Sequence, residues 1–178
     1  SESDLKTLRR IIDNGRFRVE ANDMGAVHLL SGGESPARNW VAGPTLNIFN
    51  PATLGLFADL GATRWAAPPE MSRQQIAELR AGLGREMEVE LFAHGRLPLA
   101  YSARCFTARS LDKPKDNCEL ACIHYPTGRL ASSREGQKVF NLNGIQTQSG
   151  YCYNLGNELE GMAGLVDVVR LSPEGMET

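Results

Sequence analysis

Residues 88–125 read EVELFAHGRLPLAYSARCFTARSLDKPKDNCELACIHY, and they join a strand to a segment rich in cysteine. The strand is expected at 87–92, where acidic and apolar residues alternate. Glu88 and Glu90 are two residues apart, so both side chains are expected on one face of that strand. A structural hydrogen-bonding role and a catalytic role both remain open for this pair.

Three of the four cysteines, Cys105, Cys118 and Cys122, lie in this stretch with the spacing Cys-x12-Cys-x3-Cys. One turn of helix would place the sulfurs of Cys118 and Cys122 on the same face. Thiolates bind zinc, copper(I) and iron–sulfur clusters, and the four cysteines of a cluster need not be contiguous. A structural zinc site would need a second nearby pair, which the sequence does not have. Spacing alone therefore leaves both a metal or cluster site and inert thiols open.

Strands and helices alternate on the amino-terminal side of this stretch, which favours β-α-β units and a parallel sheet. Asn50 and Pro51 have the properties of a cap and a first helical residue, and Ser72 with Gln75 forms a capping box. The expected strands are 17–21, 40–42, 63–67 and 87–92, and the expected helices are 3–14, 24–30, 51–60 and 73–83.

On the carboxyl-terminal side, residues 129–132 and 138–142 are expected to form a small hairpin. Residues 165–171 are nearly all apolar, as in a strand covered on both faces. The predicted fold class is therefore α/β, a partial TIM-like barrel of about five parallel strands plus an inserted cysteine-bearing segment. Barrel β/α units are expected at 1–104, the insertion with its hairpin at 105–160, and the last strand and tail at 161–178.

Length and first residue indicate that the barrel is incomplete. A closed eight-stranded barrel typically needs about 250 residues, and this chain of 178 begins at Ser1 with an expected helix. We therefore expect one incomplete domain. A net charge of −2 gives no general electrostatic footprint for nucleic acid, although a local basic patch remains open. No signal peptide or long apolar run is visible, so a cytoplasmic location is expected, where cysteines favour metal or redox chemistry over disulfides.

Polar residues near strand ends are candidates for catalysis, because barrel enzymes carry their chemistry on the loops that follow the strands. The alternative for each carboxylate is a helix cap or a solvated charge, so no catalytic residue is assigned. Arg104 and Arg109 flank Cys105 and either favour its thiolate or face solvent. Cys152 is expected to be a packed or free thiol. The candidates are Glu20, Asn22, Asp23, Asn47, Glu70, His94 and Arg170.

The run Glu90-x-Phe92-x-x-Gly95-x-Leu97, followed by Cys105, resembles the signature of peptidase family U32. Within that family, LPLAYSARCFTARS (97–110), FNLNGIQTQSGY (140–151), YNLGNEL (153–159) and GLVDVVRLSPEG (164–175) are similar to the ubiquinone-biosynthesis branch represented by UbiV. Three positions depart from the wider signature, which weakens a general peptidase interpretation. They are Arg96, Pro98 and Ala103, where a small residue, a cysteine and a glycine are usual.

The resemblance implies a part of that protein without its amino-terminal portion and extreme carboxyl terminus. It implies a 4Fe-4S cluster with Cys105, Cys118 and Cys122 as metal ligands and a fourth ligand, an amino-terminal cysteine, outside this sequence. It also implies a heterodimer with a UbiU-like paralogue that hydroxylates the aromatic ring of a quinone precursor anaerobically, with prephenate as the oxygen donor. A peptidase, an RNA-hydroxylation factor and a zinc-binding scaffold remain as alternatives, and so does the choice between electron transfer and substrate activation by the cluster.

Overall fold

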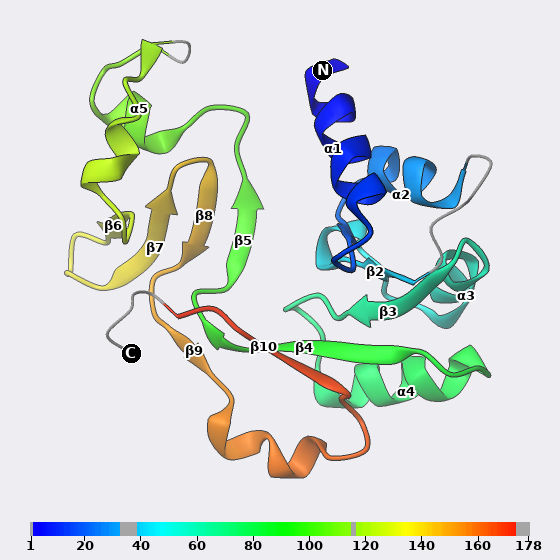
Figure 1. Ribbon diagram of the computed structural model, residues 1–178. Coiled ribbons are helices and arrows are strands. Elements are labelled where there is room, and N and C mark those ends of the chain that lie inside the picture. Colours follow the sequence, from blue (N-terminus) through cyan, green and yellow to red (C-terminus); the bar gives the residue numbers. More distant parts are fainter. Residues whose placement is uncertain (1, 33–38, 115–116, 174–178) are drawn as a thin grey trace. The chain divides into compact units, whose positions relative to one another are not determined.

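The structure is a computed structural model that describes residues 2–32, 39–114 and 117–173 (Figure 1). The chain divides into two compact units. Unit 1 comprises residues 1–92 and 158–169, and unit 2 comprises residues 93–157 and 170–178. Two of the boundaries between these ranges fall within the strands β4 (Glu88–Gly95) and β10 (Val168–Leu171).

Five strands form the parallel part of the main sheet, in the order β1-β2-β3-β4-β10. The amide of Asp167 donates to Val89 and that of Ser172 donates to His94, so β10 runs in the same direction as β4. The predicted α/β class with about five parallel strands is therefore confirmed. The strands are β1 (Glu20–Ala21), β2 (Trp40–Ala42), β3 (Ala62–Ala66), β4 (Glu88–Gly95) and β10 (Val168–Leu171).

The expected helices are all present: one precedes the first strand, and the other three lie between strands. Asp23, Asn50 and Ser72 cap these three helices and specify where they begin. Asn50 caps one helix through a 2.8 Å bond from the Thr53 amide. The helices are α1 (Glu2–Asn14), α2 (Met24–Ser31), α3 (Pro51–Asp59) and α4 (Arg73–Leu83), with 3-10 turns η1 (Pro44–Leu46), η4 (Gly156–Glu158) and η5 (Glu160–Met162).

The capping box at the start of α4 is formed as the sequence predicts. The Gln75 amide donates to Ser72 Oγ at 3.3 Å, and the Ser72 amide donates to Gln75 Oε1 at 2.8 Å. Ser72→Ala removes one acceptor at the helix start and should lower the free energy of unfolding by about 1 kcal/mol. Urea unfolding of the two proteins measures this, and equal midpoints would show that the cap contributes nothing.

The core of unit 1 lies between the sheet and its helices. Trp40 and Trp65 are fully buried, and Trp40 meets Phe57 of α3 edge to face with ring centroids 6.3 Å apart. Ile76 and Leu79 of α4 are also buried. The apolar residues of these short strands thus pack the sheet against the helices. The charged residue Arg64 of β3 forms ion pairs with Glu88 and Glu90 of β4.

Unit 2 is built on a four-stranded antiparallel sheet of order β5-β8-β7-β6. The expected hairpin is confirmed as β6 and β7, and the turn at Gly144 joins β7 to β8. Strands β5 and β8 were not expected from the sequence. The elements are β5 (Pro98–Tyr101), α5 (Phe106–Ser110), η3 (Ala121–His124), β6 (Arg129–Ser132), β7 (Lys138–Asn143), β8 (Gln146–Ser149) and β9 (Tyr153–Asn154).

Two predicted strands are shorter in the structure than in the sequence analysis. The first begins at Glu20 and the last at Val168. Leu165 and Val166 instead donate their amides to the carbonyl of Met162, which holds them in the turn that precedes β10. No helix in the described part of the chain is both long and apolar enough to cross a membrane.

Candidate functional site

The three clustered cysteines lie in unit 2 on two neighbouring elements. Cys105 occupies the cap position of α5, and Cys122 lies in η3, which packs against α5. Cys118 precedes η3, and its carbonyl accepts the Ala121 amide at 3.1 Å. Cys105 and Cys118 are half-buried and Cys122 is exposed, and none of the three forms a disulfide. Residues far apart in the sequence are thus gathered into one region.

The expectation that Cys118 and Cys122 share one helical turn is wrong. Glu119 and Leu120 between them have φ values of 52° and 51°, in the left-handed region. An α-helix cannot continue through two such residues. Helical periodicity therefore does not give the separation of the Cys118 and Cys122 sulfurs. That separation depends on the turn formed by Glu119 and Leu120.

The cysteines suit an iron–sulfur cluster in the chemistry of their donors, since three free thiols are available in one region. In the described ranges, however, no three His, Cys, Asp or Glu side chains stand close enough together to hold a metal ion. The assignment of Cys105, Cys118 and Cys122 as ligands therefore stays a prediction, and no cluster geometry follows from these positions.

A cavity of about 760 Å³ opens beside Cys105 and carries several cations. Both arginines that flank this cysteine in the sequence line it, as does Lys113. Lys113 also forms an ion pair with Glu119, and this pair lowers the pKa of the Glu119 carboxyl. The lining residues are Arg104, Cys105, Ala108, Arg109, Asp112, Lys113 and Pro114.

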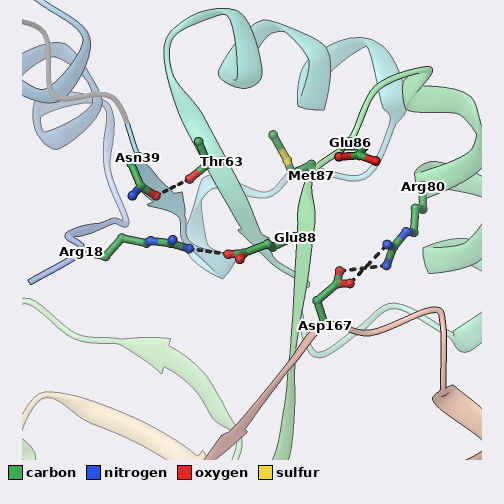
Figure 2. A pocket seen from close by; sticks show the side chains of 8 residues that line it. All are labelled: Arg18, Asn39, Thr63, Arg80, Glu86, Met87, Glu88 and Asp167. Carbon is green, nitrogen blue, oxygen red and sulfur yellow. Dashed lines mark hydrogen bonds and ion pairs between the residues drawn. The ribbon is translucent and has the colours of Figure 1, made fainter.

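A second charged site lies in unit 1 at the amino-terminal edge of the sheet, around a cavity of about 590 Å³ (Figure 2). Arg18 pairs with Glu88 there, and Arg64 donates to Glu88 at 2.8 Å and to Glu90 at 3.3 Å. Hydrogen bonds from Arg64 and Arg18 lower the pKa of Glu88. Glu88 and Glu90 therefore share one face as predicted, and the contacts support their structural role.

Asp167 links β10 to both β4 and α4 at the same edge (Figure 2). Its carboxylate accepts the Val89 amide at 2.8 Å and bonds Arg80 at 2.9 and 3.3 Å. Burial acts to raise the pKa of Asp167, but the Val89 amide and the Arg80 guanidinium outweigh it, so the pKa lies below its ordinary value. The charged form of Asp167 is therefore the form that stabilises this edge.

Asp167→Asn should lower the free energy of unfolding by about 1 kcal/mol at pH 7, a modest value because the group is partly exposed. Since the folded pKa lies below the unfolded one, this stabilisation is complete above about pH 4 and is lost as the pH falls through the folded pKa. The difference between the two proteins should therefore shrink in acid. Urea unfolding from pH 7 down to pH 3 checks this, and a constant difference would contradict it.

The candidates at the carboxyl ends of β1 and β2 come together in part. Asn22 donates to Glu20 at 2.6 Å and accepts from Thr45 Oγ1 at 2.9 Å. Sequence reasoning missed Thr45, because this contact joins residues 23 positions apart. Asp23 caps α2 through the Ala26 amide, which confirms its alternative structural interpretation.

The remaining strand-end candidates lie on other elements or in turns. Asn47 is the left-handed residue that ends η1, with φ 56°. Glu70 is exposed in a turn, and Arg170 is half-buried on β10. His94, at the end of β4, has its Nε2 3.8 Å from the sulfur of Cys152. The two residues are 58 positions apart, so sequence reasoning did not reveal this contact.

Comparison with known proteins connects this chain to proteins named for hydroxylation. It is similar to tRNA hydroxylation protein P of Escherichia coli (strain K12), with 30% identity over 121 residues, and to the protein of that name from Haemophilus influenzae, with 37% over 121 residues. Each match covers 66% of this chain and 26% of the relative, so the chain spans about a quarter of the relatives' length. No solved structure matches.

The match to the family profile extends over both units of the chain. It runs from residue 2 to residue 157 and so includes β1 to β4, the antiparallel sheet and all four cysteines. With most of the chain aligned to a single profile, the protein belongs to peptidase family U32.

Proposed function

We propose that the chain is part of an iron–sulfur protein that takes part in an oxygen-independent hydroxylation. The observation that carries this proposal is the gathering of three free cysteines on α5, η3 and the turn between them, within the region matched by the family profile. Three thiolates are the larger part of the usual four-cysteine ligand set. The fourth ligand would come from outside these 178 residues.

The first candidate substrate is the aromatic ring of a ubiquinone precursor. The support is the likeness of residues 97–110 and 140–151 to the ubiquinone-biosynthesis branch of the family. In the structure these two stretches form β5 with α5 and β7 with β8, which build most of unit 2 around the cysteines. On this proposal the partner is a UbiU-like paralogue and the oxygen comes from prephenate.

The second candidate substrate is tRNA. This candidate is supported by two relatives, each named tRNA hydroxylation protein P, that share 30% and 37% identity with this chain, and the comparisons support it better than the first candidate. Arg104, Arg109 and Lys113 around the cavity at Cys105 would suit a phosphate backbone. The net charge of −2 counts against extended contact with nucleic acid.

One experiment separates the two substrates. The full-length gene is deleted, and anaerobically grown cells are assayed for ubiquinone and for hydroxylated nucleosides in digested tRNA. Loss of ubiquinone with unchanged tRNA supports the first candidate, and the reverse supports the second. Restoration by the wild-type gene but not by a Cys118→Ala variant ties either activity to the cysteines. A deletion that changes neither product would refute both.

Binding to RNA gives an independent check on the second candidate. If tRNA is the substrate, the purified protein should bind it with an affinity that falls steeply between 50 and 200 mM salt. Arg109→Glu should then weaken binding at least about tenfold, since it replaces a phosphate contact by repulsion. Arg85→Glu, in unit 1 and not among the residues that line this cavity, is the matched control and should leave the affinity unchanged.

A further inference from the structure

Strand pairing within unit 2 brings Cys152 to His94. In the antiparallel pair of β4 and β9, His94 lies opposite Asn154, and Gly95 lies opposite Tyr153. Cys152 is therefore two residues from the partner of His94, in the diagonal position that shares its face of the ladder. The contact of 3.8 Å between Cys152 Sγ and His94 Nε2 follows from this register.

The surroundings of Cys152 favour a reactive thiol. The side chain is exposed and forms no disulfide. The guanidinium of Arg96 donates to the carbonyls of Ser149 and Gly150 at 3.0 and 2.6 Å, which fixes the turn just before Cys152 and adds positive charge to it. An imidazole and a nearby cation are the surroundings in which cysteine thiols become nucleophilic thiolates.

We propose that Cys152 and His94 form a reactive thiol–imidazole pair and that Cys152 is a site of modification by peroxides. His94 Nε2 takes the thiol proton, and the sulfur attacks one oxygen of the peroxide. The S–O bond forms as the O–O bond breaks, and the leaving hydroxide takes the proton from the imidazole to become water. Sulfur is oxidised by two electrons to the sulfenic acid while the peroxide is reduced.

This site goes beyond the proposed hydroxylation and does not depend on it. Cys152 is separate from the three proposed cluster ligands, so its thiol stays available whether or not a cluster is bound. Its side chain is exposed, so small oxidants can reach the sulfur.

The test measures the reactivity of Cys152 in the full chain. The protein is treated with iodoacetamide at pH 7, samples are quenched over time, and the peptide that contains Cys152 is quantified by mass spectrometry. Wild-type Cys152 should react several times faster than glutathione under the same conditions. His94→Asn should slow the labelling about five- to tenfold. His124→Asn, which removes another exposed imidazole of unit 2, is the matched control and should have no effect.

A second measurement addresses the oxidation itself. After treatment with hydrogen peroxide in the presence of dimedone, the adduct should appear on Cys152 in the wild type, be absent in Cys152→Ser, and decrease in His94→Asn. His94→Gln keeps a hydrogen-bonding side chain but cannot take the proton, so it should be as slow as His94→Asn. Labelling of Cys152 no faster than glutathione, or full reactivity in either His94 variant, would overturn the proposal. Melting temperatures of the variants report whether folding is intact.

Discussion

Alanine at Cys105, Cys118 or Cys122 will remove the iron and acid-labile sulfide from the full-length protein, and alanine at Cys152 will leave both in place. The reason is that a 4Fe-4S cluster is usually held by four thiolates. Losing one of the three proposed ligands leaves only two within this chain. Cys152 follows the four strands of the antiparallel sheet in the sequence, and its sulfur lies 3.8 Å from His94 Nε2.

The measurement is iron, sulfide and zinc content together with an absorption spectrum, on protein purified without oxygen. Cys152→Ala is the matched control, because it removes a free thiol from the same unit. If Cys152→Ala loses as much iron as Cys118→Ala, the ligand assignment is wrong. Zinc in place of iron would make the cysteines structural and would favour the scaffold hypothesis.

The same variants bear on function, because a cluster that only stabilises the fold and a cluster that takes part in hydroxylation differ in their effects. Loss of the cluster with an unchanged melting temperature and loss of the hydroxylated product would indicate a chemical role. A large fall in melting temperature would indicate that the cluster stabilises the fold.

Local signals in the sequence predicted the parallel part of the fold well. Asn50 and Ser72 mark their helices with short polar side chains, whose hydrogen-bond partners lie only three residues away. The strands of the main sheet contain apolar residues that pack against the helices, and in β4 these alternate with Glu88 and Glu90, so their approximate positions were visible as well. Signals of this kind depend on neighbouring residues and do not require knowledge of the tertiary structure.

The antiparallel sheet was only half predicted, for a physical reason. Strand β8 reads Gln-Thr-Gln-Ser, so it has no apolar alternation to reveal it. Its side-chain amides instead form hydrogen bonds, since Asn141 donates to Gln148 at 2.9 Å and Gln148 donates to Gln146 at 2.9 Å. A polar strand of this kind is stabilised by its cross-strand partners, which a single sequence does not identify.

The candidate sites show the same limit. The cysteine spacing pointed to one region, and the structure places the three residues on neighbouring elements, but two left-handed residues with ordinary side chains broke the expected helical turn. The Cys152–His94 contact and the Arg64–Glu88 pair join residues 58 and 24 positions apart. Contacts over such separations are set by strand register, and register is a property of the folded sheet.

The charged edge of the main sheet should make a large contribution to stability through Arg64. Arg64→Met should lower the free energy of unfolding by about 3 kcal/mol, because it removes the guanidinium from two carboxylates, of which Glu90 is only 7% exposed. Arg85→Met breaks the pair with Asp59, whose side chain is 65% exposed, and should cost less than about 1 kcal/mol. Urea unfolding at pH 7 compares the two, and equal costs would contradict the importance of burial.

The cost of losing Arg64 must also depend on its carboxylate partners. In the Arg64→Met background, Glu90→Gln removes the charge that has lost the Arg64 guanidinium. The double variant should therefore lose at least about 1 kcal/mol less free energy of unfolding than the two single variants lose when their losses are added. Hydrogen bonds from Arg64 and Arg18 hold the folded pKa of Glu88 below its ordinary value of 4.5. The stabilisation from this pair is therefore complete above about pH 4.5 and is lost as the pH falls through the folded pKa. The Arg64→Met protein should thus approach the wild type in acid, because protonated carboxyls no longer need the guanidinium, whereas a purely steric effect of the substitution would persist unchanged at low pH.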